Sequence, residues 1–433
     1  PLNKGGWGGE NSSDKQISFP KQDTPPLFKG GENSSDKQIS LPKQDTPHKP
    51  TITILSGIQP WIPATTTVIG IITVSFPLPN FEQRRESWQT YLTEANISLD
   101  NINLDTLTNR FRLTSHQIAN AVKSAENKVR WEISKGLSHE LSKITIDALF
   151  AAARGQSGHH LAALTQKIEP TYSWDDIILS PDAKTQLREI CDRAKYHYLV
   201  QEEWGFNRKL SLGKGLNVLF SGPPGTGKTM AAEVIASELK LDLHKIDLSQ
   251  IVSKYIGETE KNLNRIFTAA ANSNAILLFD EADALFGKRS EVKDAHDRYA
   301  NIEIGYLLQK MEEYEGVAIL TTNFRSNMDD AFVRRLAFII EFHFPNQKQR
   351  RLIWQQIWPD TVSISDLDLD FLAHHFEISG ANIRNIALAA AYLAADDGGV
   401  IKMIHLIRAI RREYQKMGKI LIEEDFGKYA GLR

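Results

Sequence analysis

Eight consecutive residues near the middle of the chain could bind the phosphates of a nucleotide. They are Gly222, Pro223, Pro224, Gly225, Thr226, Gly227, Lys228 and Thr229. Glycines let the backbone turn so that its N–H groups point at phosphate oxygens, and a following helix N-terminus adds partial positive charge. Lys228 should reach the β- and γ-phosphates, and Thr229 should ligate Mg²⁺. This loop of the Walker A type predicts ATP and Mg²⁺ as cofactors.

Two adjacent carboxylates follow an apolar run further along the chain. The run Ile276–Phe279 is typical of a buried strand, and it places Asp280 and Glu281 at the strand's carboxyl end, where parallel sheets bind ligands. Asp280 would hold Mg²⁺, partly through water, and Glu281 would polarise the attacking water. Adjacent carboxylates also occur in solvated turns after strands. The phosphate loop about fifty residues ahead of this pair favours a role in nucleotide hydrolysis.

Further polar residues could complete a hydrolytic site. Asn323 follows a third apolar run and could orient the lytic water. Arg334 and Arg335 could stabilise the transferring phosphoryl group from a neighbouring subunit, an effect of about 10³–10⁵ in rate; a solvated charge pair near a helix end would leave the same sequence. Arg384 could be a further phosphate sensor or an ordinary helix-surface arginine.

The elements that must position these residues alternate between strands and helices. Short apolar runs at 216–220, 276–279 and 317–321 each lie near helical sequence, a pattern typical of a parallel sheet flanked by helices. After Pro345 the sequence is helical through Gln415. The predicted fold class is therefore α/β, a P-loop module followed by an α-helical lid.

With these motifs in place, the region from Trp174 to Gln415 resembles the AAA+ ATPases, within them the protein-remodelling clade. The resemblance implies a ring of identical subunits, expected to be a homohexamer. The roles it implies are contacts beside the adenine for Asp176 and Ile177, sensor 1 for Asn323, arginine fingers for Arg334 and Arg335, and the sensor-2 helix for Arg384.

Lys254, Tyr255, Ile256 and Gly257 fit a pore-loop pattern. An aromatic ring on a glycine-hinged loop can grip varied side chains through apolar contact, which suits movement of a polypeptide through a ring. A Tyr-Ile pair buried between two helices would give the same sequence. The stretch 253–303 is also similar to AAA proteins of phage-tail-like contractile injection systems, so a component of such a system is a candidate client.

Three functions are compatible with this sequence: an ATP-driven protein remodeller or unfoldase, a nucleotide-switched assembly scaffold with little turnover, and a nucleic-acid motor or loader. The presence of Glu281 and Asn323 favours turnover over a scaffold. The chain has 51 basic and 53 acidic side chains, a formal charge of −2, and hence no overall basic field for nucleic acid. The net charge does not exclude a local basic patch.

A sequence repeat predicts a degenerate copy of the lid. The pattern Pro-Asn-x-x-Gln-Arg-Arg-x-x-Trp occurs at 79–88 and at 345–354, and apolar positions continue to match downstream. The first copy has no phosphate loop ahead of it, so a packing or docking role is expected. The predicted domains are a low-complexity leader at 1–50, the lid copy at 51–139, a helical linker at 140–171, the nucleotide-binding domain at 172–345, the lid at 346–416 and a tail at 417–433.

The leader and the single cysteine carry no predicted chemistry. Residues 8–25 recur almost unchanged at 30–47 in Ser/Lys/Gln/Pro-rich sequence, so disorder is expected there. Cys191, being alone, excludes a disulfide within the chain and suits a reducing, cytoplasmic setting. No signal peptide is expected, and the apolar run Val68–Phe76 is too short to span a membrane and is expected to be a buried strand.

Overall fold

The computed structural model describes residues 57, 72, 74–99, 101–135, 144–156, 161, 164–209, 215–251, 258–273, 275–282, 295–323 and 333–431. Residues 76–433 form one compact unit. The predicted leader and the pore-loop residues Lys254–Gly257 lie outside the described residues, so both stay predictions.

A six-stranded sheet is the centre of the unit, in the order β1-β3-β4-β5-β2-β6. All neighbouring strands are parallel except β1, which is antiparallel to β3. The α/β fold with a mostly parallel sheet is therefore confirmed. The strands are β1 Gln166–Ile168, β2 Leu216–Ser221, β3 Leu243–Asp247, β4 Ile276–Asp280, β5 Val317–Thr322 and β6 Phe338–Glu341.

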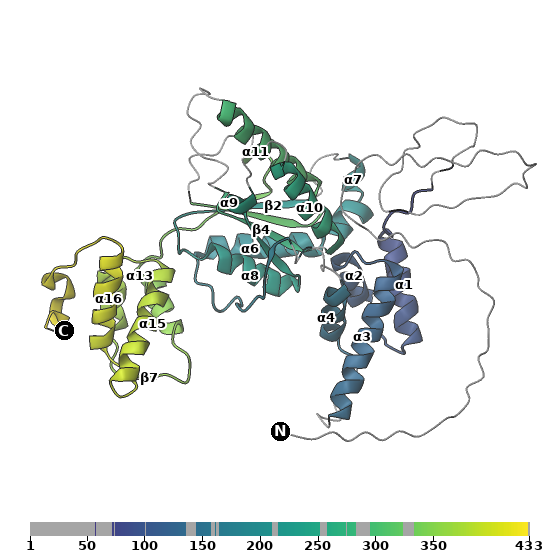
Figure 1. Cartoon of the computed structure of the whole chain (residues 1–433). Coiled ribbons are helices and arrows are strands. Elements are labelled where there is room, and N and C mark those ends of the chain that lie inside the picture. The colour runs from purple at the N-terminus through teal and green to yellow at the C-terminus, as the bar shows by residue number, and fades with distance from the viewer. Residues whose placement is uncertain are drawn as a thin grey trace, which may run out of the picture. The chain divides into compact units, whose positions relative to one another are not determined.

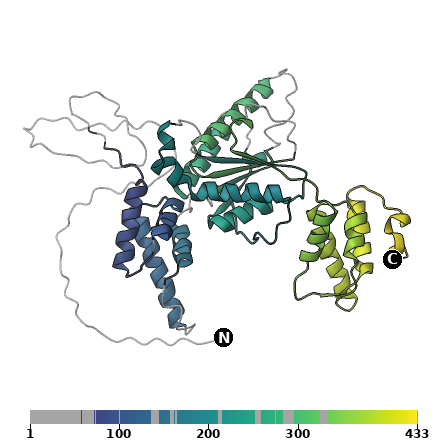
Figure 2. The ribbon, with the colours of Figure 1, turned by 180° about the vertical axis from the view of Figure 1, so that it is seen from behind.

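Helices cover both faces of this sheet because the central strands β2, β4 and β5 are mainly apolar and buried on both sides. On β2, Val218 and Phe220 pack with α6 and α8, whereas Leu219 packs with α10 and α11 on the opposite face. The same layering is visible in two opposite views (Figures 1 and 2). The helices are α6 Pro181–Lys195, α8 Lys228–Leu239, α10 Glu258–Ser273 and α11 Ala295–Glu313, with short turns η2 Leu199–Glu203, α7 Phe206–Lys209 and α9 Leu248–Ile251.

A helical lid follows β6, as the sequence predicts. Its core also includes Phe426, which is 1% exposed, so the region predicted as a tail contributes to the lid. Leu421 and Tyr429 of the same segment pack against this core, and such a short irregular segment has no helical periodicity that would predict its packing. The lid elements are α13 Gln347–Gln356, α14 Leu369–His375, α15 Gly380–Asp396, α16 Met403–Lys416, the strands β7 Ser363–Ile364 and β8 Val400–Ile401, and η5 Glu423–Tyr429.

A second helical bundle precedes the sheet. Leu149 and Phe150 of α4 lie in its core, so this part of the predicted linker is the fourth helix of the bundle. Ile72 and Phe76 are 87% and 90% exposed and lie in no strand, which contradicts the predicted buried strand at these described positions. The bundle helices are α1 Phe81–Glu94, α2 Asn101–Arg110, α3 Ser115–Ser134 and α4 Ile146–Gln156.

The bundle and the lid repeat each other's contacts as well as each other's sequence. Arg84 donates to the carbonyl of Pro79 at 2.7 Å, and Arg350 donates to the carbonyl of Pro345 at 2.8 Å. Each arginine thereby closes the turn that begins its helix. Further matched features are the ion pairs Arg85–Asp105 at 2.6 Å and Arg351–Asp370 at 2.5 Å, and the fully buried Trp88 and Trp354.

Candidate functional site

The predicted phosphate loop joins β2 to α8 and has the backbone that only glycine allows. Gly222 and Gly227 have φ of 143° and 102°. A Cβ atom on Gly222 would clash with the carbonyl oxygen of Phe342, which follows β6. The loop is thus a concave turn pressed against the neighbouring strand, with α8 starting at Lys228. This shape leaves the first N–H groups of a 12-residue helix at the end of the loop, an arrangement that suits phosphate.

Lys228 and Asn323 meet at this loop. The Lys228 Nζ donates to the carbonyls of Gly222 at 2.5 Å and Pro223 at 3.0 Å, and to the Asn323 Oδ1 at 3.0 Å. Asn323 directly follows β5, the strand next to β2 in the sheet. The structure therefore brings together the ammonium and the amide that the sequence places far apart.

Asp280 lies at the carboxyl end of β4 and is held from two sides. Its Oδ2 forms an ion pair with Lys245 of β3 at 2.6 Å, and its Oδ1 accepts a short hydrogen bond from the Thr321 hydroxyl of β5. Burial alone would raise the pKa of Asp280, but the hydrogen bonds from Lys245 and Thr321 outweigh it and hold the pKa below its ordinary value. Asp280 is therefore a carboxylate across the neutral range.

The oxygen donors present fit Mg²⁺. The Thr229 hydroxyl and the Asp280 carboxylate are the hard ligands that this ion takes, and Mg²⁺ usually completes its shell with water and substrate phosphates. A larger acidic cluster is not required, and the described part of the chain contains no group of three or more His, Cys, Asp or Glu that could hold a metal ion.

Glu281 follows β4 in an unusual backbone conformation. Its φ is 55°, in the left-handed region that non-glycine residues rarely adopt, and its side chain is exposed. Such strain tends to occur at functional sites, where it fixes the direction of a side chain. The two adjacent carboxylates also differ in burial, because Asp280 is half-buried and Glu281 is exposed.

Family comparisons agree with this geometry. Residues 218–344 match the model of the ATPase family associated with various cellular activities (AAA), and residues 80–159 match that of the contractile injection system ATPase helical domain. The chain carries an AAA ATPase domain. The first bundle, predicted from the sequence repeat as a copy of the lid, thus matches a known helical domain family.

Relatives of the AAA domain include proteasome subunits. The chain is 31% identical over 242 residues to the 26S proteasome regulatory subunit 6B homolog of Dictyostelium discoideum. The aligned residues are 54% of this chain and 58% of that protein. The chain is 28% identical over 289 residues to a Caenorhabditis elegans protein named for the same subunit, covering 65% and 67%. A Plasmodium falciparum protein named as a cell division cycle ATPase is 31% identical over 264 residues, 58% of this chain and 20% of that protein.

The lid touches the phosphate loop of the AAA domain. The Ala381 N–H donates to the Gly225 carbonyl at 3.2 Å, and a Cβ on Gly225 would lie 2.7 Å from the Ser379 Oγ. Ser379 is the N-cap of α15, so this helix begins against the loop. Arg384 lies one turn further along α15 with an exposed side chain. Its role as a phosphate sensor stays a prediction.

The two predicted arginine fingers lie on the surface, just before β6. Arg334 and Arg335 are both exposed. The Arg335 Nε forms an ion pair with the Glu312 Oε1 near the end of α11 at 3.3 Å, with the arginine side chain 45% exposed. Because such a pair contributes little and exchanges readily, both arginines are accessible to a second molecule.

The residues expected beside the adenine have mainly structural contacts. Asp176 accepts hydrogen bonds from the Ser173 N–H and hydroxyl, both at 2.7 Å, and these lower its pKa. Ile177 is 1% exposed and belongs to the core of the AAA domain. The contacts predicted beside the adenine for Asp176 and Ile177 stay predictions.

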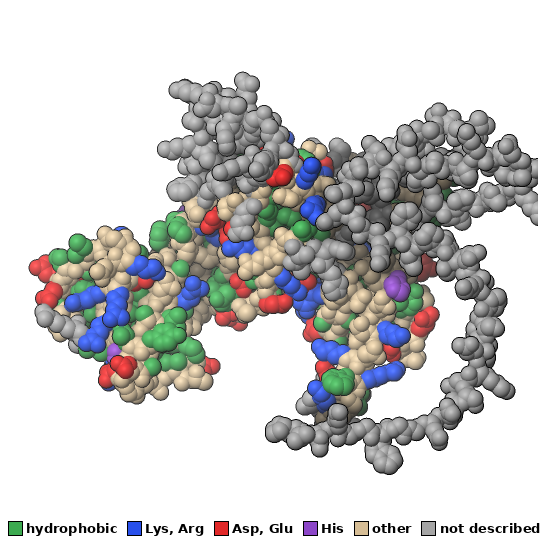
Figure 3. All heavy atoms as spheres, in the orientation of Figure 1, with side chains coloured by type: hydrophobic (Ala, Val, Ile, Leu, Met, Phe, Trp, Pro, Cys, Tyr) green, Lys and Arg blue, Asp and Glu red, His purple; other side chains and the backbone are tan. Residues whose placement is uncertain are grey.

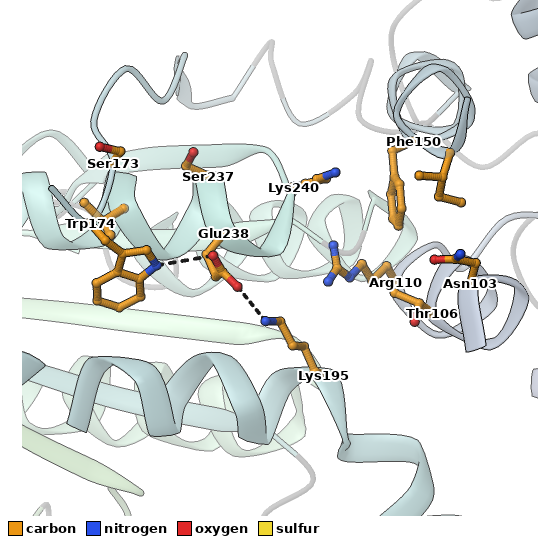
Figure 4. Close-up of a pocket in the computed structure, with 12 residues that line it drawn as sticks. Asn103, Thr106, Arg110, Phe150, Ser173, Trp174, Lys195, Ser237, Glu238 and Lys240 are labelled. Carbon is orange, nitrogen blue, oxygen red and sulfur yellow. Dashed lines mark hydrogen bonds and ion pairs between the residues drawn. The ribbon is translucent and has the colours of Figure 1, made fainter. Parts of the chain in front are cut away.

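A cavity of about 410 Å³ lies at the other end of α8, between that helix, α6 and the first bundle. Figure 4 shows Glu238 held between the Trp174 Nε1 at 3.2 Å and the Lys195 Nζ at 2.5 Å. Arg110 of α2 donates to the carbonyl of Leu239, the last residue of α8, at 2.7 Å. The helix that starts at the phosphate loop thus ends against the first bundle.

Two further residues of the site, Lys245 and Thr321, are absent from the prediction made from sequence. Both follow from strand alternation: β3 carries Lys245 and Asp247 on one face, and β5 carries Thr321 on the same face as Asp280. A lysine on the strand next to the one that ends at Asp280 is the signal that could have identified Lys245.

Across the described helices, none is both long and apolar enough to cross a membrane.

Proposed function

We propose that this chain hydrolyses ATP and uses the reaction to remodel a polypeptide client as a ring of identical subunits. The observation that carries the proposal is the meeting of Lys228, Asn323 and the phosphate loop at one edge of the sheet. The chain spans 58% of the length of the Dictyostelium discoideum relative. The activity, substrate and partners of this chain are therefore proposed from its own residues.

Each residue of the site would have a distinct task. Bound Mg²⁺ would neutralise phosphate charge, and Thr229 and Asp280 would hold it. Lys228 would exchange the loop carbonyls for phosphate oxygens. Glu281 would take the proton of the attacking water, and Asn323 would orient that water. General-base catalysis of this kind contributes about 10²–10⁴-fold in rate.

A second copy of the chain is the partner that the surface favours. Leu388 and Tyr392 of α15 are four residues apart, hence on one face of the helix, and are 58% and 73% exposed. The equivalent positions of α3 in the first bundle are Lys123 and Asn127. Hydrophobic side chains are visible on the lid surface beside basic ones (Figure 3). The exposed face is apolar on the lid and polar at the matched positions of the first bundle. This difference supports a contact between subunits that the lid makes and the first bundle does not.

A polypeptide is the client that the residues favour. Tyr255 lies between α9 and α10, where a loop of the AAA domain could face a ring axis. The helical domain match at 80–159 supports a client from a contractile injection system. The proteasome names of the relatives support handling of protein substrates.

Tyr255→Ala is expected to separate hydrolysis from client handling. An unfolded, labelled model polypeptide should stimulate phosphate release by the wild type, and the variant should keep basal release while losing the stimulation. Melting temperature should barely move, because an axial tyrosine packs against nothing. A core tyrosine would instead cost about 3–5 kcal/mol on truncation.

Three results of this assay separate the alternative functions. Stimulation by polypeptide that depends on Tyr255 supports a remodeller. Stimulation by single-stranded DNA, with steep salt dependence, would support a nucleic-acid motor. Nucleotide binding with negligible release under all conditions would support an assembly scaffold.

A further inference from the structure

Lys245 stands out because the proposed function gives it no task. It lies on β3, an inner strand of the sheet, and its side chain is 31% exposed. The register of β3 and β4 places Lys245 beside Leu278 and Asp247 beside Asp280. Lys245 is therefore diagonal to Asp280 on the same face, a spacing that a long side chain can cross.

Both oxygens of the Asp280 carboxylate are occupied by protein groups. The Lys245 Nζ lies 2.6 Å from Oδ2, and the Thr321 hydroxyl donates to Oδ1. The Asp280 side chain is 20% exposed, so its charge is partly removed from water and needs a counter-charge. Asp247 cannot supply this counter-charge, because it is itself an acid in register with Asp280. Its Oδ1 accepts a hydrogen bond from the Ser249 N–H at 2.9 Å.

We propose that Lys245 is a built-in counter-cation of Asp280, which the incoming magnesium ion displaces. Lys245 would thereby set the magnesium concentration at which the site takes up nucleotide. The inference rests on the proposed function, since it assigns Asp280 to the metal. Lys245 is a positioning residue here and would touch neither substrate nor metal.

The expected consequence is competition between two cations for one carboxylate. Without the ammonium, Asp280 would be free for Mg²⁺, and the repulsion between Lys245 and the metal would vanish. The half-saturating Mg²⁺ concentration for nucleotide binding should therefore fall in Lys245→Met, by about threefold to tenfold for a partly exposed pair.

The test is a Mg²⁺ titration of fluorescently labelled ADP binding to the full chain. Lys245→Met and Lys245→Gln should both need less Mg²⁺ than the wild type, and Lys245→Arg should resemble the wild type. Lys167→Met is the matched control, because Lys167 on β1 is also ion-paired, to Asp242 at 3.1 Å, and is 38% exposed. It should not change the Mg²⁺ requirement.

Thermal melting gives a second readout that does not depend on turnover. In EDTA without nucleotide, Lys245→Met should melt below the wild type because the partly buried Asp280 carboxylate keeps the Thr321 hydrogen bond but loses its counter-charge. Saturating Mg²⁺ and ADP should close this gap. An unchanged or increased Mg²⁺ requirement in Lys245→Met, or a gap that persists with Mg²⁺ and ADP, would overturn the inference. If the wild type itself binds no labelled ADP, the proposed function fails as well.

Discussion

Glu281→Gln should bind ATP about as well as the wild type and lose most of its hydrolysis, by about 10²–10⁴-fold. The amide has the size of the carboxylate but cannot accept the proton of the attacking water. Because Glu281 is exposed and follows β4, the change removes chemistry without removing core packing. Phosphate release and nucleotide affinity, measured on the same preparation, give the two quantities.

Glu424→Gln is the control for this variant, since Glu424 is an exposed carboxylate in η5 of the lid. It should hydrolyse ATP at the wild-type rate. Near-normal phosphate release by Glu281→Gln would remove Glu281 from the mechanism and leave Asp280 as a metal ligand only.

Arg334→Ala should bind ATP and hydrolyse it about 10³–10⁵-fold more slowly, the range expected for an arginine that stabilises the transferring phosphoryl group. If the arginine acts across a subunit interface, mixing this variant with Lys228→Ala should restore part of the activity. In a mixed ring, an interface whose phosphate loop comes from the Arg334→Ala chain and whose arginine comes from the Lys228→Ala chain has both groups intact. Phosphate release from equimolar mixtures, at several protein concentrations, measures the effect.

Arg408→Ala tests whether any lost surface arginine has this effect, because Arg408 is exposed on α16 of the lid. It should be active alone. Mixed rings that are demonstrated by mass but remain inactive would show that Arg334 acts within its own subunit or only holds structure.

The phosphate loop could be predicted from sequence because its chemistry is local. Positive φ at Gly222, Gly225 and Gly227 needs residues without a Cβ atom, and Lys228 follows directly. The strands that deliver Asp280 and Asn323 could be predicted too, because a strand buried on both faces leaves a continuous apolar run.

Contacts between strands were harder to predict because they depend on register. The Lys245–Asp280 ion pair joins residues of two strands that are paired only in the folded sheet. The place of Ile177 in the core likewise depends on tertiary packing with residues of α6 and α8. No local pattern in the sequence distinguishes such a residue from a ligand contact.

The first bundle shows a different limit. Matching α1 to α13 through the repeat predicted its helical character, and the matched contacts of Arg84 and Arg350 show why these residues recur. The repeat gave no information on α4, because that helix has no matched sequence in the lid. Its apolar residues Leu149 and Phe150 were therefore assigned to a linker.

The central claim is that ATP is bound and hydrolysed at the loop that ends on Lys228. Phosphate release from Mg²⁺-ATP by the wild type and by Lys228→Ala, each with its ATP affinity measured in parallel, tests it most directly. The structure predicts steady release by the wild type, and loss of both binding and release in a Lys228→Ala chain that still unfolds cooperatively in the absence of nucleotide. Equal release by the two proteins would contradict the account.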